Sequence, residues 1–197
     1  MNQIARSKVW LSAAPRSRLA FKLARKCRAA WADRRGVAAI EFGIFSILLF
    51  ASLANVTDVS IYIYQRMEVE NATEVAAQAA LKACGSGSTL PATTNCANLL
   101  TAITTAMQNT SLGTAVTLQS GSPSEGYKCV NASGALQAVS GVTSRPANCT
   151  AAGMPSLLPG DYITIQTTFT YTPIFAKLSV AAGFPSPITR SAMLRLG

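Results

Sequence analysis

A long apolar run with positive charge on one side only constrains this chain more than any other feature. From Phe42 to Thr57 the sequence has no charged residue, and the apolar pattern resumes as far as Tyr64. A helix from Val37 to Tyr64, at 1.5 Å per residue, is long enough to cross a hydrocarbon core of about 30 Å. We therefore expect a membrane-spanning segment at about residues 42–64.

Positive charge gathers before this segment. Residues 1–36 hold ten of the 17 Lys and Arg residues and one of the eight acids, whereas the rest of the chain carries seven of each sign. Because Lys and Arg are enriched in cytoplasmic flanks, the pair Arg34 and Arg35 is expected to be a topology signal that keeps the N-terminus in the cytoplasm. The sequence pI of about 9.7 thus describes a basic leader, and no nucleic-acid partner is expected.

Glu41 is the one carboxylate at the start of the apolar run, where a charge costs a few kcal/mol and usually has a functional reason. Gly36, four intervening residues, then Glu41 and Phe42, leading into an apolar helix, resemble the processing site of type IV-type prepilins. With small residues directly after the glycine, the pattern is most similar to the TadE-like pseudopilins of tight-adherence (Flp) pilus systems. The resemblance covers about residues 34–80.

The resemblance implies a non-enzymatic pilus-assembly pseudopilin or minor pilin. A prepilin peptidase would cut between Gly36 and Val37, and Glu41 and Phe42 would serve assembly. The implied partners are the inner membrane, the prepilin peptidase and other pilins or pseudopilins. The protein would be a single-pass bacterial inner-membrane protein with a periplasmic head, able to reach the cell surface in the pilus. No cofactor is expected.

Two other interpretations remain open. The first is a minor pseudopilin of a type II secretion system. The second is a secreted or signal-anchored binding module, because Ser52-Leu53-Ala54 is a small-x-small site after a run of signal-peptide length, which predicts cleavage after Ala54. That interpretation leaves Glu41 unexplained. The mature N-terminus separates the three routes: Val37 for a pilin, Asn55 for a secreted protein and Met1 for a signal anchor.

The cysteines divide at the apolar segment, with Cys27 before it and four after it. An even number beyond the membrane is typical of an oxidising compartment. Three pairings are possible, and we favour Cys84–Cys96 and Cys129–Cys149, since each closes a short loop. The chain has no His and no C-x2-C spacing, so a zinc site is not expected.

Catalytic patterns are missing from the sequence. A chain without His lacks the commonest general base, and neither a Gly-rich phosphate loop nor a G-x-S-x-G elbow occurs. Most acids beyond the leader fall in the predicted long helix, where we assign them to a solvated face or to assembly contacts. The sequence therefore does not predict an enzyme.

The expected fold class is α+β. We expect a basic leader at residues 1–36, one long helix at 37–83 and a head domain at 84–197. The helix is apolar all round in its first half and amphipathic in its second, and a hinge near Asn55–Asp58 is the alternative.

In the head, a small and mostly antiparallel sheet is expected. The predicted elements are, in order, a helix at 97–108, a strand at 114–118, loops and short strands at 120–159, a strand at 161–171, a short helix at 173–182 and a last strand from Ile188.

Overall fold

A computed structural model describes residues 34–197 of the chain. The expectations for the leader before residue 34, including the position of Cys27, lie outside the described residues. The chain divides into two compact units, Met1–Phe50 and Ala51–Gly197. The described part of the first unit is helical. The second unit holds the remainder of the same helix, together with the sheet and the short helices.

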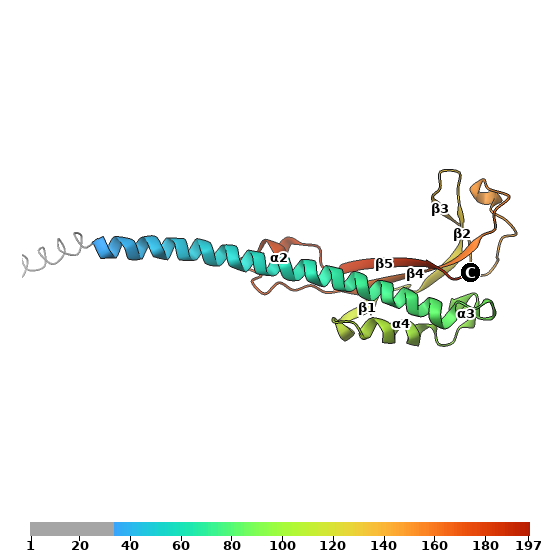
Figure 1. The fold of residues 1–197 in the computed structure, drawn as a ribbon, viewed down its shortest axis with the longest axis horizontal. Coiled ribbons are helices and arrows are strands. Elements are labelled where there is room, and N and C mark those ends of the chain that lie inside the picture. Colours follow the sequence, from blue (N-terminus) through green and yellow to red (C-terminus); the bar gives the residue numbers. More distant parts are fainter. Residues whose placement is uncertain (1–33) are drawn as a thin grey trace, which may run out of the picture. The chain divides into compact units, whose positions relative to one another are not determined.

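The long helix, α2, runs from Arg34 to Cys84 without interruption, so the alternative with a hinge near Asn55–Asp58 is wrong (Figure 1). It contains the one described stretch that is long and apolar enough to cross a membrane. The helix ends where the backbone N–H of Gly85 donates to the carbonyl of Leu81 at 2.8 Å. A Cβ at Gly85 would lie 2.5 Å from that carbonyl oxygen, so only glycine fits this close approach.

The head contains a five-stranded antiparallel sheet built around β4 (Gly160–Phe169). On one side, β5 (Ile188–Arg195) pairs with β4 from Tyr162 to Phe169. On the other side, β4 pairs with β2 (Ser124–Val130) near its start and with β1 (Val116–Leu118) near its end. The last strand, β3 (Leu136–Gly141), pairs with β2. A long helix followed by a small antiparallel sheet confirms the expected α+β class.

Short helices fill the connections. They are α3 (Ala92–Asn95), α4 (Leu99–Gln108) and the 3-10 turns η1 (Gly87–Thr89), η2 (Gly113–Ala115), η3 (Thr150–Ala152) and η4 (Val180–Gly183). The predicted helix at 97–108 is therefore confirmed as α4, while the predicted strand at 114–118 shortens to β1 because η2 takes its first residues.

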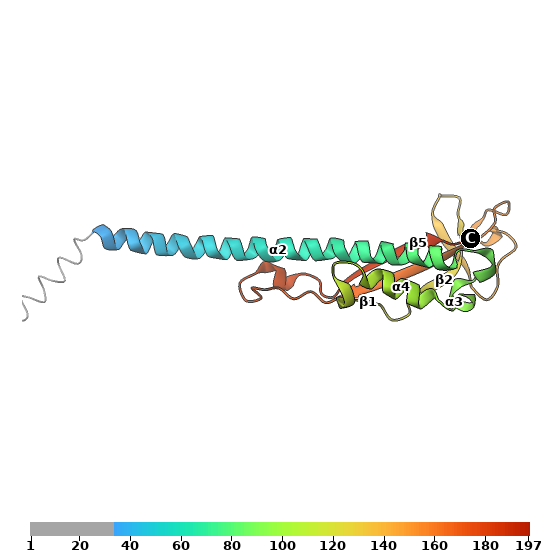
Figure 2. The same cartoon turned by 60° about the horizontal axis from the view of Figure 1, so that its bottom comes forward.

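One core joins the second part of α2 to α4 and to the inward face of β4. In α2, Val69, Ala72, Ala76 and Ala80 are fully buried, and they pack in the same cluster as Ile103, Met107, Ile163 and Ile165. Both helices thus cover the same face of the sheet, as the two views show (Figures 1 and 2). The three alanines repeat at a spacing of four, which lets the helix backbone approach the sheet closely.

A polar contact crosses this core at its centre. The hydroxyl groups of Thr73 on α2 and Thr167 on β4 lie 2.6 Å apart, and the Thr73 hydroxyl also lies 2.6 Å from the carbonyl oxygen of Val69. Both side chains are buried, so the hydrogen bonds satisfy groups that would otherwise be costly inside an apolar core.

The predicted helix at 173–182 is wrong. The segment between β4 and β5 forms turns and η4 instead. The backbone N–H groups of Ile174, Phe175 and Val180 donate to side chains of α2 rather than to carbonyl groups one turn earlier. In a helix at 173–182, the N–H of Val180 would bond to the carbonyl of Ala176, and its donation to Asn55 breaks that ladder. The N–H groups of Ile174 and Phe175 would have no partner in the first turn of such a helix, so their bonds to Asp58 do not exclude it.

Candidate processing and assembly site

The residues singled out for processing and assembly lie at the start of α2, directly after Arg34 and Arg35. Val37 and Glu41 are four residues apart and therefore lie on the same side of the helix. Both are exposed, and the Phe42 side chain is 74% exposed. Within the described part of the chain, no hydrogen bond or ion pair of the Glu41 carboxylate is seen.

Gly36 is not required by the fold. A Cβ placed on Gly36 would meet nothing within 4 Å, and the same holds for Gly43, seven residues or about two helix turns further on. A glycine that costs helix propensity without relieving a close contact needs another reason. Recognition of the extended chain by a peptidase is such a reason, so this observation is compatible with processing at Gly36.

The first half of α2 exposes large apolar side chains on every side. Those more than half exposed are Val37, Ile40, Phe42, Ile44, Phe45, Ile47, Leu48, Leu49, Phe50, Leu53 and Val56. An apolar surface of this extent is not left in water by a stable protein, because monomeric soluble domains rarely expose large contiguous apolar patches. It fits a single-pass membrane helix.

Asp58 is the residue that sequence reasoning placed wrongly, since it lies on no solvated face and is fully buried. Its two carboxylate oxygens accept the backbone N–H groups of Ile174 and Phe175, each at 3.0 Å. The Tyr171 hydroxyl donates to the Asp58 carbonyl at 3.2 Å. The signal was present in the sequence, because Asp58 is the one charge between Glu41 and Arg66.

Two further α2 residues fix the same segment, residues 172–185, which we call the strap. The Asn55 side chain donates to the Leu178 carbonyl at 3.0 Å and accepts the Val180 N–H at 2.8 Å. The Tyr62 ring lies 5.0 Å from the Tyr171 ring and 4.9 Å from the Phe184 ring, measured between centroids. Burial, followed by the nearby Asp58 carboxylate, raises the pKa of the Tyr171 hydroxyl, which therefore stays protonated as a donor.

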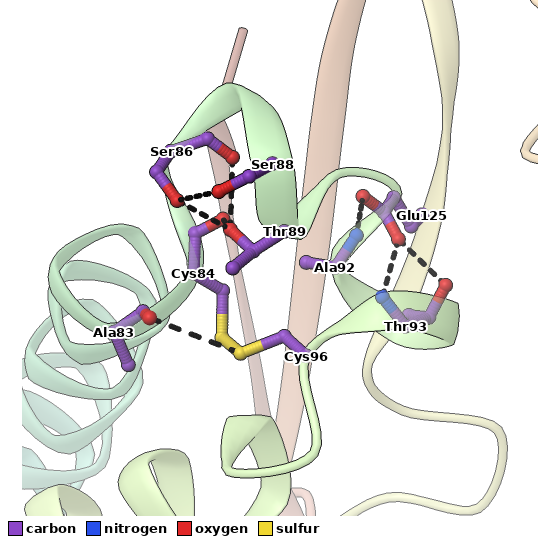
Figure 3. The surroundings of a disulfide bond; sticks show 9 residues. All are labelled: Ala83, Cys84, Ser86, Ser88, Thr89, Ala92, Thr93, Cys96 and Glu125. Carbon is purple, nitrogen blue, oxygen red and sulfur yellow. Dashed lines mark hydrogen bonds between the residues drawn. A yellow bond between two sulfur atoms is a disulfide. The ribbon is translucent and has the colours of Figure 1, made fainter.

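The cysteine pairs favoured from loop length are those at disulfide distance. The sulfur atoms of Cys84 and Cys96 lie 1.97 Å apart at the end of α2 (Figure 3). Next to them, the Glu125 carboxylate on β2 accepts the backbone N–H groups of Ala92 and Thr93, both at 2.7 Å. The first pair and Glu125 together tie the end of α2, the short helix α3 and strand β2 to one another.

The second pair, Cys129 and Cys149, has its sulfur atoms 1.99 Å apart. It sits in a separate small cluster with Ala152, onto which Val139 and Met154 pack. This cluster holds few apolar side chains, so the covalent link carries much of the local order there.

A second buried acid, Asp161, begins β4 and has a different environment from Asp58. It is buried, and neither of its carboxylate oxygens has a hydrogen-bond partner among the described residues. Loss of hydration on burial, and then the neighbouring Glu125 carboxylate, raise the pKa of Asp161 to about 6, against an opposing effect of Arg145. Within residues 34–197, no group of three or more His, Cys, Asp or Glu side chains is placed to hold a metal ion.

Comparison with curated proteins and with solved structures gives no match. Comparison with protein families matches residues 36–78 to the family described as TadE-like protein. The matched stretch includes Gly36, Glu41 and the buried Asp58, and it ends within the part of α2 that packs on the sheet. From Gly36 to Gln78 this chain therefore carries a TadE-like segment, consistent with a TadE-like pilin of tight-adherence pilus systems.

Proposed function

We propose that this chain is a pseudopilin or minor pilin of a tight-adherence pilus, cut after Gly36 by a prepilin peptidase. The observation that carries the proposal is the TadE-like match on a helix whose apolar side chains are exposed. Such proteins are structural components rather than enzymes. The leader is cytoplasmic, the start of α2 crosses the inner membrane, and the head lies on the periplasmic side.

We propose that the membrane-crossing part is residues 37–54, earlier in the helix than the expected 42–64. From Val37 to Ala54, an α-helix spans about 27 Å, close to the thickness of a hydrocarbon core. From Asn55 onward, side chains of α2 bind the strap through polar atoms. We place the periplasmic boundary at Asn55–Asp58, with the exposed Tyr64 ring just beyond it, as aromatic residues prefer the interface.

In this proposal, Glu41 fixes the axial position of each subunit relative to its neighbours in the assembled pilus. Cleavage after Gly36 creates a new amino group on Val37, four residues from the Glu41 carboxylate. Within one helix, the Val37 amino group can reach the Glu41 carboxylate only if the new N-terminus bends back along the helix. Between neighbouring helices, Glu41 of one subunit can pair with the Val37 amine of the next, which offsets the cost of both charges near hydrocarbon and fixes the axial position of the subunits.

The mature N-terminus tests the proposal. Gly36→Leu should leave the full-length precursor in the membrane, whereas Gly43→Leu should be cut normally. The two positions form a matched pair, since a Cβ at either meets nothing within 4 Å and neither change disturbs packing. Intact mass and N-terminal peptide mapping are the measurements.

Three results would overturn the assignment. A mature N-terminus at Asn55 indicates a secreted protein, an intact Met1 in wild type indicates a signal anchor, and normal maturation of Gly36→Leu excludes a prepilin peptidase. A type II secretion role shares the cleavage and is separated by which pilins co-purify with the mature protein.

A further inference from the structure

The strap exposes three large apolar side chains. Ile174 and Val180 are each 65% exposed, and Leu178 is 58% exposed. Each of the three binds α2 through its own backbone, Ile174 to Asp58 and both Leu178 and Val180 to Asn55. The strap therefore runs beside α2 at this level (Figures 1 and 2). An exposed apolar side chain alone needs no explanation, but three in one short segment do.

The helix at this level is apolar as well. Leu53 and Val56 are more than half exposed, and the charged Asp58 between the strap and the helix is fully buried and hydrogen-bonded. The strap adds a single charge, the exposed Lys177. At this level, the helix on one side and the strap on the other therefore expose apolar side chains together with one positive charge and no exposed acid.

The strap backbone sets the depth at which such a surface can lie. Irregular backbone exposed to lipid is not tolerated within hydrocarbon, because its N–H and C=O groups have no partners there. At the boundary, headgroups and water satisfy those groups, while apolar side chains reach about 5–10 Å toward the acyl chains. A lysine at this depth extends to the headgroups, which are anionic in part.

We propose that the strap is a membrane-interface anchor, in which Ile174, Leu178 and Val180 insert into the periplasmic leaflet beside α2 and Lys177 contacts lipid phosphates. The occupant is lipid because α2 is apolar at the level of the strap on its other side too, where Leu53 and Val56 are more than half exposed in the same unit, Ala51–Gly197. The anchor fixes how deeply α2 sits and holds the head against the bilayer until the subunit is extracted. This inference rests on the proposed membrane placement of α2 and does not depend on the kind of pilus.

A fluorescent label at single cysteines tests this inference. The full chain, with Cys27→Ser and both native cysteine pairs kept, is reconstituted in phosphatidylcholine–phosphatidylglycerol vesicles. An environment-sensitive NBD label is placed through Leu178→Cys, Ile174→Cys, Phe45→Cys or Leu158→Cys. Leu158 is the matched control, since it is 72% exposed on a head loop outside the strap. Phe45 reports on the membrane helix itself.

We expect labels at residues 174, 178 and 45 to show blue-shifted emission that brominated lipids quench. The label at residue 158 should show neither the blue shift nor the quenching. Water-like emission at 178 and 174 with quenching at 45 would overturn the anchor and leave the membrane helix intact. Blue-shifted emission without quenching by brominated lipid would also overturn it, because a protein surface would then cover the strap. No quenching at residue 45 would overturn the membrane placement and the anchor together.

Discussion

The Asp58 carboxylate accepts the backbone N–H of Ile174 at 3.0 Å, across 116 positions of the chain. A second bond at the same distance joins it to the N–H of Phe175. A charge in the middle of an apolar helix is tolerated here because the returning segment supplies two donors to the ionised form. The pair also fixes the start of the segment before β5 against α2.

Asp58→Ala should release the strap. The change leaves two backbone N–H groups without an acceptor, and the expected loss of unfolding free energy is on the order of 2 kcal/mol. Hydrogen exchange in detergent should increase at residues 172–185. In Asp58→Asn, which keeps one acceptor oxygen, the exchange rate of the strap should lie between those of wild type and Asp58→Ala. Glu74→Ala, on the exposed side of the same helix, is the control. Unchanged exchange in the strap of Asp58→Ala would contradict the role given to this carboxylate.

Ala76→Leu should overpack the contact between α2 and the sheet. Ala76 is fully buried, and extra methylenes in a filled core typically cost about 1–3 kcal/mol. Thermal unfolding of the detergent-solubilised protein should shift to lower temperature. Ala83→Leu makes the same chemical change at an exposed position and should leave the midpoint near wild type. Equal midpoints for the two variants would mean that the helix does not lie closely on the sheet.

Loss of the Cys129–Cys149 link should loosen residues 129–154 more than any other part of the head. The loop spans 20 positions, and closing a loop of that size is worth about 3 kcal/mol by the chain-entropy estimate. Non-reducing peptide mapping should find Cys129 joined to Cys149 and Cys84 joined to Cys96. In the double variant Cys129→Ser/Cys149→Ser, hydrogen exchange should rise in this loop while β4 stays protected. Free thiols at these positions in exported protein would refute both the pairing and the oxidising compartment.

Glu41→Ala should block assembly without blocking processing. The variant keeps Gly36 and the apolar helix, so it should be inserted and cut to a Val37 N-terminus. It should then fail to co-purify with pilus or pseudopilus partners, because the Val37 amine of a neighbour has lost its counter-charge. Glu74→Ala is again the matched control and should assemble normally. Normal incorporation of Glu41→Ala would leave Glu41 as an interfacial residue without a register role.

Asp161 should make the head more stable in acid than at neutral pH. Its pKa is raised from 3.8 to about 6 in the folded protein, so between these values the folded state binds more protons than the unfolded state. Stability from this group is complete below pH 3.8 and is lost as the pH rises through 6, with a full effect on the order of 3 kcal/mol. Asp161→Asn should flatten this part of the pH profile in thermal unfolding and raise the midpoint at pH 7. A profile identical to wild type would show that Asp161 is not buried as an acid.

The sequence by itself determined the parts that rest on local pattern. The uninterrupted apolar run before Asp58 and the alanines at helical spacing after Tyr64 favoured one long helix, because hydrophobic periodicity is read within a few turns, and the unbroken α2 excluded the hinged alternative. The alternation around Ile163 and Ile165 determined β4 for the same reason. Gly36, Glu41 and Phe42 at a fixed spacing were enough to indicate the TadE-like segment, and the short loops between cysteines were enough to favour the two pairs.

Tertiary structure alone decided what depends on contacts between distant residues. From the sequence, Asp58 was assigned to a solvated face or an assembly contact, and only the return of residues 174–175 made it a buried acceptor. The apolar residues of the strap looked like a short helix, but the N–H of Val180, which a helix would bond to Ala176, donates to Asn55. Burial of Asp161 beside Glu125 follows from strand register, which no local pattern specifies. The energies of these groups depend on which partners and how much water surround them, and that is set only when the chain has folded.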